Sequence, residues 1–150
     1  MIVTPQLVRI PSPEALVYKF VFQQITPGGP RNFDAFNSLT ANIDLMTIPD
    51  DHAIAGVRIR NLVRFQGPSI TSLTCSVGAN NGATSDNTFY ASPYELSLAV
   101  TDRSLQMSSA FQTYSAQAHY VYARFTAVGA NLSALTAGSV EIAVRVVPLL

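Results

Sequence analysis

Apolar and polar residues alternate along most of the chain with the two-residue period of β-strands. Residues 16–23 illustrate the pattern, because their even-numbered positions are all leucine or aromatic: Leu16, Tyr18, Phe20 and Phe22. The odd-numbered positions, which fall on the opposite face of a strand, mix valine with Lys19 and Gln23. Such alternation predicts a strand with one buried face and one wetter face.

Further segments alternate in the same way and predict further strands. They are residues 38–49, 53–65, 69–78, 118–128 and 138–147. In the second of these the alternation is lost after Asn61, which predicts a β-bulge. Residues 92–95 differ, because Ser92, Pro93 and Glu95 stand in capping-box order and predict one or two helical turns.

Segments rich in glycine, proline and asparagine separate the predicted strands. Residues 26–33 and 78–87 have the composition of exposed loops, and residues 129–138 that of a short turn that covers Leu132 and Leu135. Roughly eight short strands with few helical signals predict an all-β fold, an antiparallel β-sandwich or jelly roll with short helical turns and extended termini. The length suits a single β domain over residues 1–150.

Both ends of the chain carry apolar residues that we expect to be covered. Residues 1–13 contain three prolines, which disfavour a helix, and are predicted to form an extended N-terminal arm. The alternative for this segment is an ordinary edge strand. The apolar residues at the two ends include Ile2, Val3, Leu7, Val8, Leu149 and Leu150. Their cover is either the chain's own core or a neighbouring subunit.

The composition favours assembly over catalysis. Hydrophobic residues make up 48% of the chain and charged residues only 12%, so neutral polar side chains must form much of the surface. Such a surface costs less to desolvate than a charged one when a partner covers it. A mildly polar monomer is the alternative. Nine basic and nine acidic residues cancel without any basic run, so nucleic acid is not an expected partner.

Targeting signals and disulfides are not indicated either. Cys75 is the single cysteine, so it cannot form a disulfide within the chain, and we expect it to be buried. The N-terminal residues lack the apolar run of a signal peptide, and no window is long enough to span a membrane. The sequence therefore predicts synthesis in the cytoplasm and no membrane partner.

Residue types that carry chemistry are sparse. His52 and His119 stand in no metal-ligand spacing, and Asp50 and Asp51 follow a proline at a predicted turn. The loop around Asp86 contains side-chain oxygens that could bind calcium, but they do not follow the order of an EF-hand. A solvated loop is the plainer interpretation. No nucleophile elbow, phosphate loop or dinucleotide motif occurs. We therefore expect no catalytic residue, no cofactor and no metal, and a protein that is not an enzyme.

One aromatic group is a candidate contact surface. Tyr120, Tyr122 and Arg124 alternate on one face of the predicted strand over residues 118–128. Amphipathic aromatics and arginine favour contact surfaces, so this face is a candidate platform for sugars or for another protein. Alternatively the tyrosines face the core, and Val121 and Phe125 line a second packed surface.

The order of several segments is similar to that of a known class of virion protein. The segments are IPDDHAIAGVRIR, SLTCSVG, FYASPYEL and AHYVYARFTAVGANLSALTAGSVEIAVRVVPL. In the order and residue pattern of these segments, about two thirds of the chain resembles small all-β head decoration (cement) proteins of tailed bacteriophages. No catalytic or diagnostic motif carries the resemblance.

The resemblance implies a structural protein on the capsid surface of a virion, made in the host cytoplasm. Such a protein binds the major capsid protein from outside, often as a homotrimer, and reinforces the shell. The candidate interaction residues are Ile2, Val3, Leu7, Val8, Tyr120, Tyr122, Arg124, Leu149 and Leu150. The alternative function is a carbohydrate-binding or structural module of a phage tail, neck or fibre.

Overall fold

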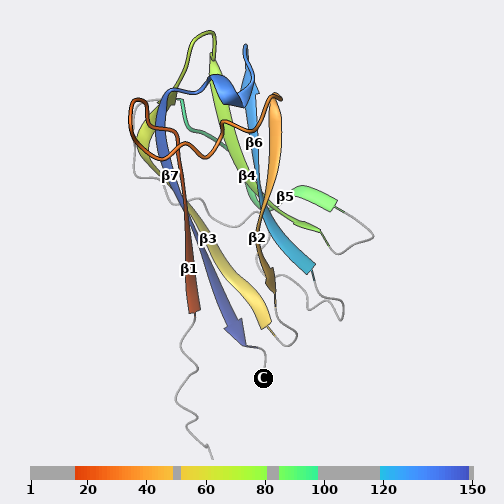
Figure 1. The fold of residues 1–150 in the computed structure, drawn as a ribbon. Coiled ribbons are helices and arrows are strands. Elements are labelled where there is room, and N and C mark those ends of the chain that lie inside the picture. Colours follow the sequence, from red (N-terminus) through yellow and green to blue (C-terminus); the bar gives the residue numbers. More distant parts are fainter. Residues whose placement is uncertain (1–15, 49–51, 81–84, 98–118, 149–150) are drawn as a thin grey trace, which may run out of the picture.

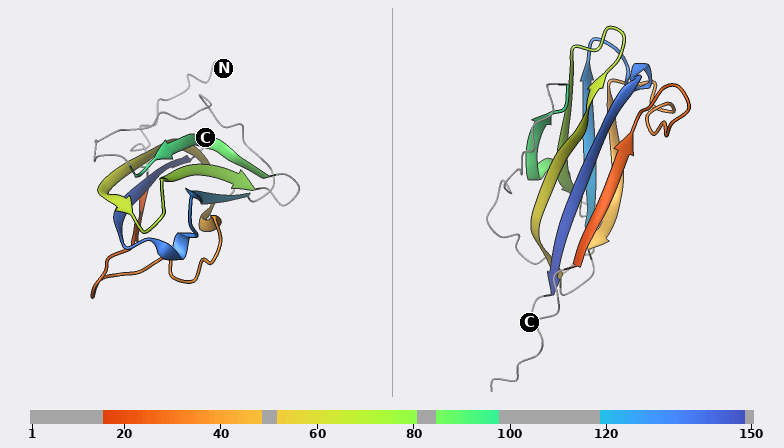
Figure 2. Two further views of the ribbon diagram at one scale, coloured as in Figure 1. Left: turned by 90° about the horizontal axis from the view of Figure 1, so that it is seen from above. Right: turned by 90° about the vertical axis from the view of Figure 1, so that its left-hand side faces the viewer.

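The computed structural model describes residues 16–48, 52–80, 85–97 and 119–148. These residues form two antiparallel sheets that pack face to face (Figures 1 and 2). The strands are β1 (Leu16–Gln23), β2 (Thr40–Ile48), β3 (His52–Gln66), β4 (Ser72–Asn80), β5 (Ser85–Glu95), β6 (His119–Val128) and β7 (Ala137–Pro148). One sheet has the order β1-β7-β3 and the other β2-β6-β4-β5. The predicted all-β antiparallel sandwich is therefore confirmed.

Connections between the strands cross repeatedly from one sheet to the other. The chain changes sheet between β1 and β2, between β2 and β3, between β3 and β4, and again between β6 and β7. These crossings are compatible with a jelly roll, but that architecture has eight strands and the described residues contain seven. Jelly-roll topology stays a prediction.

The core lies between the sheets and follows the predicted alternation. In β7, the buried apolar side chains are Val140, Ile142, Val144 and Val146. β1 pairs with β7 so that Phe20 lies beside Ile142 and Phe22 beside Val140, which places its even-numbered residues on the inward face. In the facing sheet, Val121 and Phe125 are fully buried. The two-residue period thus grouped the residues of these strands onto two faces, and the structure shows which face points inward.

The segment between β1 and β2 is anchored in the core by an aromatic side chain. Pro27, Gly28 and Pro30 are exposed, as predicted, but Phe33 is fully buried. Its ring meets that of Phe125 at a centroid distance of 4.9 Å and that of Phe65 at 5.9 Å, both edge to face. The prediction of an exposed loop was therefore wrong at its last residue, which closes one end of the sandwich.

Gln24 holds this segment in place. It is fully buried, and its Oε1 accepts a hydrogen bond of 2.9 Å from the backbone N–H of Phe33. Its Nε2 donates to Asp34 Oδ1 at 2.6 Å, and Asp34 also forms an ion pair of 2.7 Å with Arg31. The hydrogen bond from Arg31 is the main reason why the pKa of Asp34 is lowered. Both ends of a buried amide are thereby satisfied, as burial requires.

The predicted irregularity in β3 is present. The pairing of β3 with β7 shifts register between Asn61 and Val63, which confirms the bulge. Asn61 is buried there, and its Nδ2 donates a hydrogen bond of 3.0 Å to the carbonyl oxygen of Leu96. The bulge thus ties β3 to the end of β5 in the other sheet.

The predicted helical turn at residues 92–95 was wrong, because these residues belong to β5. Tyr94 pairs with Cys75 and Glu95 with Thr74 in the ladder to β4. Buried Tyr94 gains more from packing in the sheet than a single capping interaction offers. The loop predicted over residues 78–87 is also shorter than expected, since Asn80 and Ser85 still pair.

The turn before β7 has the predicted form. A 3-10 helix covers Leu132–Ala134, and both Leu132 and Leu135 are fully buried. Gly138 follows with φ of 139°, and a Cβ built on it would lie 2.2 Å from Phe65 Cδ1. Only glycine fits here, because its backbone conformation is rare for other residues and the ring of Phe65 occupies the space.

Glu95 fastens the end of β5 to the start of β4. Its Oε2 accepts a hydrogen bond of 2.7 Å from Ser72 Oγ, and its Oε1 accepts one of 3.1 Å from the backbone N–H of Leu73. The hydroxyl and the backbone N–H of Ser97 donate to the same Oε1. Desolvation raises the pKa of Glu95, but these hydrogen bonds together lower it more.

We expect Glu95→Gln to destabilise the fold near neutral pH by about 1 kcal/mol, the scale of a charge-assisted bond at a partly exposed site. Because the folded-state pKa lies below the unfolded one, this stabilisation is present above the unfolded value of about 4.3. It is lost as the pH falls through the folded value. Denaturation of the wild type and of Glu95→Gln between pH 3 and 7 measures the difference between their free energies of unfolding. This difference should become smaller in acid. Asp44→Asn, an exposed carboxylate on β2, is the control. A difference that is independent of pH would contradict a stabilising role for the Glu95 carboxylate.

Candidate interaction surface

β1 forms one edge of the smaller sheet, and its side chains are unusually apolar for an edge. Its exposed large hydrophobic residues, with exposed fractions between 40% and 54%, are Leu16, Val17, Tyr18 and Val21. β7 is the neighbour of β1 in the sheet, and no other described strand pairs with β1. Sheet edges are usually protected by charges, prolines or bulges, whereas β1 offers one charged residue, Lys19. We call this surface, residues 16–22 of β1, the β1 edge.

The backbone groups of the β1 edge can be assigned from one end of the strand. The N–H of Gln23 donates to Asn32 Oδ1 at 2.6 Å, and its carbonyl accepts from the N–H of Asn32 at 2.8 Å, so both point away from β7. Backbone direction alternates along a strand, so the groups of Val17, Lys19 and Val21 also point outward. An incoming strand would find three donors and three acceptors in line.

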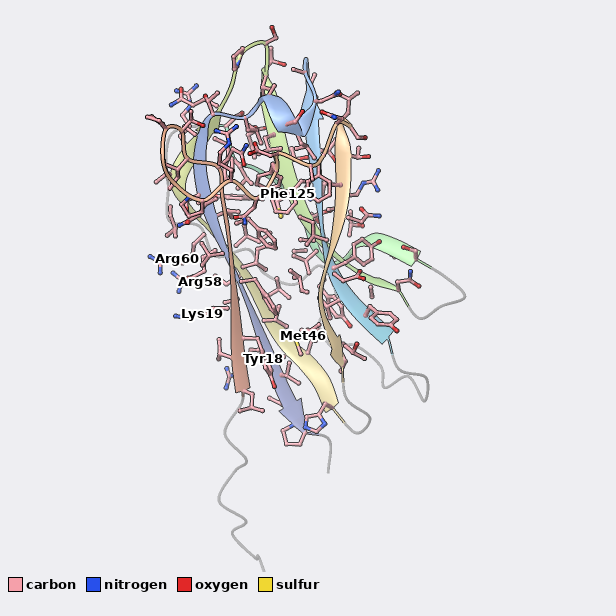
Figure 3. The ribbon with its side chains drawn as sticks, viewed as in Figure 1. Tyr18, Lys19, Met46, Arg58, Arg60 and Phe125 are labelled. Carbon is pink, nitrogen blue, oxygen red and sulfur yellow. The ribbon has the colours of Figure 1, made fainter. Side chains whose placement is uncertain are left out.

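Side chains flank this edge on both faces of the sheet. Figure 3 shows Tyr18 on β1 and Met46 on β2 pointing into the space between the two sheets. Val17 and Val21 lie on the outer face of the same strand. A strand added to the β1 edge would therefore bury apolar surface on both of its sides.

The predicted tyrosine platform is not assembled as a flat aromatic surface. Tyr120, Tyr122 and Arg124 do share the outer face of β6, but Tyr122 is 3% exposed and its hydroxyl lies 2.8 Å from Ser85 Oγ. Arg124 Nη1 donates to Asn42 Oδ1 at 3.1 Å. Tyr120, at 47% exposed, is the accessible one of the two tyrosine rings.

Several predicted residues lie outside the part of the chain that the structure describes. They are Ile2, Val3, Leu7, Val8, Asp50, Asp51, Leu149 and Leu150, together with the side chain of His119. His52 begins β3 opposite Pro148 and is half-buried. Asp86 accepts hydrogen bonds from the backbone N–H and hydroxyl of Thr88, as in an Asx-turn. Among the described residues, no three His, Cys, Asp or Glu side chains are grouped to hold a metal ion.

Cys75 is fully buried in the middle of β4, as predicted. Burial raises the pKa of its thiol, so the reactive thiolate is scarce at neutral pH. We expect the folded protein to resist labelling by a thiol reagent and to take up one equivalent after unfolding in guanidinium. Thr71→Cys, at an exposed position just before the same strand, is the control and should react at once. Fast labelling of native Cys75 would contradict its burial.

Sequence reasoning missed the β1 edge as a surface, although the valines on its second face were a visible signal. No helix within the described residues has the length and apolar character needed to cross a membrane. Comparison with known protein families, with curated proteins and with solved structures found no match.

Proposed function

We propose that this chain is a structural virion protein that binds the outer surface of a capsid shell and stabilises it without catalysis. The observation that carries the proposal is the β1 edge, a strand edge that no other described strand covers, with exposed apolar side chains on both faces. Strand addition at such an edge supplies main-chain hydrogen bonds for affinity and side-chain pockets for specificity. This is chemistry of assembly, and it needs no active site.

Energetic considerations support a role for the edge in assembly. Full burial of a valine or leucine contributes about 1.5–3 kcal/mol, and Leu16, Val17 and Val21 are each roughly half exposed. Covering these three side chains would contribute a few kcal/mol in addition to the backbone hydrogen bonds. The contacts of one edge are therefore weak alone. Many copies bound to one shell, or three copies in a homotrimer, would make several such contacts at once.

The low charge content and the resemblance to phage decoration proteins support the choice of a capsid shell as the partner. In a chain with only 12% charged residues, the surface is inexpensive to desolvate over a broad contact. The alternative, a carbohydrate-binding module, has less support. Its platform needed two neighbouring tyrosines, and Tyr122 is covered beside Ser85.

Co-sedimentation with purified capsid shells that lack this protein tests the proposal. We expect the chain to pellet with the shells at a saturable ratio and to raise the temperature at which they break open. Sedimentation velocity of the free protein tests self-association, for which a trimer is expected. A chain that stays in the supernatant and binds glycans instead would overturn the proposal in favour of the carbohydrate-binding alternative.

A further inference from the structure

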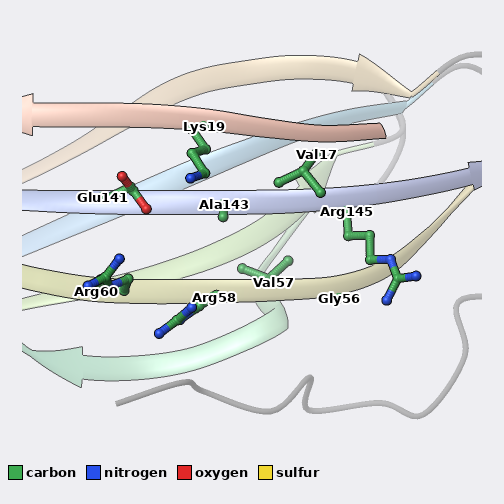
Figure 4. Close-up of a pocket in the computed structure, with 9 residues that line it drawn as sticks. All are labelled: Val17, Lys19, Gly56, Val57, Arg58, Arg60, Glu141, Ala143 and Arg145. Atoms are coloured by element: carbon green, nitrogen blue, oxygen red, sulfur yellow. The ribbon is translucent and has the colours of Figure 1, made fainter. Parts of the chain in front are cut away.

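The outer face of the β1-β7-β3 sheet carries a groove with a volume of about 450 Å³. It lies on the surface turned away from the core, and Figure 4 shows side chains of all three strands around it. The groove arises because small residues occupy its floor. Ala143 of β7 stands between Lys19 of β1 and Arg58 of β3, and Gly56 stands opposite Arg145.

The rim of this groove is strongly basic. Lys19, Arg58, Arg60 and Arg145 are four of the chain's nine basic residues, and Glu141 is the one acidic residue among the lining side chains. Four positive charges and one negative leave a local charge of +3 on a chain whose net charge is zero. In Figure 4, Lys19 extends toward β7 and Arg145 extends from β7 over β3.

Three of these cations lack partners within the described residues. Neither a hydrogen bond nor an ion pair engages the side chains of Lys19, Arg58 or Arg145 there. Lys19 and Arg58 flank Ala143 on neighbouring strands, so their Cα atoms are separated by two strand spacings, about 10 Å. An anionic group resting on Ala143 would lie between them.

We propose that this groove binds an acidic, extended segment of a partner protein, with carboxylates on the basic rim and apolar side chains on the floor. Arginine suits carboxylates because its guanidinium presents paired donors in one plane. The floor at Ala143, with Val17 beside it, is apolar, and an apolar centre with a charged rim is the anatomy of a protein interface.

Nucleic acid fits the groove less well for two reasons. The phosphate backbone is recognised by an extended basic track, whereas these cations surround one short groove, and Glu141 among them repels phosphates. In an extended peptide, alternate side chains point to the same side about 6.6 Å apart. That is also the spacing of Arg58 and Arg60, which alternate on β3. The inference concerns the chemistry of the partner and does not depend on that partner being a capsid.

Binding of defined peptides to the full-length protein tests the inference. The probes are a capped peptide of alternating glutamate and valine, the same peptide with glutamine for glutamate, and an oligothymidylate. We expect the glutamate peptide to bind and to shift the amide NMR signals of Lys19, Arg58, Ala143 and Arg145. Binding should weaken as salt is added, because surface charges are screened. The glutamine peptide should bind at least several-fold more weakly.

Charge-neutralising variants locate the site. Arg58→Gln and Arg145→Gln should each weaken binding of the glutamate peptide by about two- to fivefold, the range that corresponds to the energies of exposed ion pairs. Arg124→Gln makes the same change of charge on the outer face of the other sheet and should leave binding unchanged. Ala143→Leu fills the floor without changing the charge and should also weaken binding. These positions are solvent-facing, so the fold should persist, and circular dichroism checks this.

Three results would each overturn the inference. The first is no binding of the glutamate peptide at millimolar concentration. The second is equal affinity for the glutamate and glutamine peptides, or an equal effect of Arg124→Gln. The third is tight binding of the oligothymidylate at these residues without binding of the peptide, which would assign the groove to phosphates.

Discussion

Phe33→Ala is expected to lower the free energy of unfolding by about 3–5 kcal/mol, the usual cost of removing a buried phenylalanine from a core. Phe33 is fully buried, and its ring lies within 6.4 Å of those of Phe22, Phe36, Phe65 and Phe125. These rings come from both sheets and from the segment between β1 and β2. The cavity would therefore open where the two layers are held together, and three of the four neighbouring rings belong to strands, which cannot simply collapse into it.

Phe36→Ala is the matched control for this prediction. Phe36 belongs to the same segment and meets Phe33 at a ring distance of 6.3 Å, but it is only partly buried. Its removal should cost clearly less. Urea or guanidinium denaturation of the two variants and the wild type measures the difference. Equal losses for Phe33→Ala and Phe36→Ala would contradict the larger contribution assigned to the fully buried Phe33.

Val21→Pro is expected to weaken assembly through the β1 edge strongly while leaving the fold intact. The N–H of Val21 points away from β7, so proline removes a donor that only an added strand would use. Loss of one backbone hydrogen bond, about 0.5–1.5 kcal/mol, together with the steric bulk of the ring should weaken association about tenfold or more. Shell binding and self-association by sedimentation report the loss.

Val21→Ala separates the backbone effect from the side-chain effect. Both variants remove the valine side chain, but alanine keeps the N–H, so we expect an intermediate loss of assembly. If Val21→Pro proves unstable, Val21→Lys places a protective charge at the same edge position and should block strand addition without touching the ladder to β7. Normal assembly of Val21→Pro or Val21→Lys would contradict a role for the β1 edge.

Alternation predicted most of the fold, because one face of nearly every strand is buried against the other sheet. It failed at residues 92–95, where a local capping signal competes with pairing that places Tyr94 opposite Cys75. It also failed at Phe33, since a single aromatic residue in a loop sequence carries no period. Both errors arise from long-range contacts that local patterns do not contain.

Local patterns also could not predict the basic groove or the burial of Tyr122, for a related reason. Val17, Arg58 and Arg145 are far apart along the chain and meet only because β1 and β3 both pair with β7. The alternation of residues 53–65 places Arg58 and Arg60 on one face of a strand. It does not show which strands lie beside that strand. Tyr120 and Tyr122 were correctly placed on one face, yet the sequence pattern did not show that Tyr122 is buried and that its hydroxyl lies beside Ser85 of β5.

A cryo-EM map of virions that contain this protein tests the central claim most directly. We predict density for the sandwich on the outer surface of the shell, with the β1 edge in contact with a strand or groove of a neighbouring chain. Val17, Lys19 and Val21 should then make backbone hydrogen bonds across that contact. A protein that is absent from the shell surface, or that is bound there with its β1 edge facing solvent, would contradict the account.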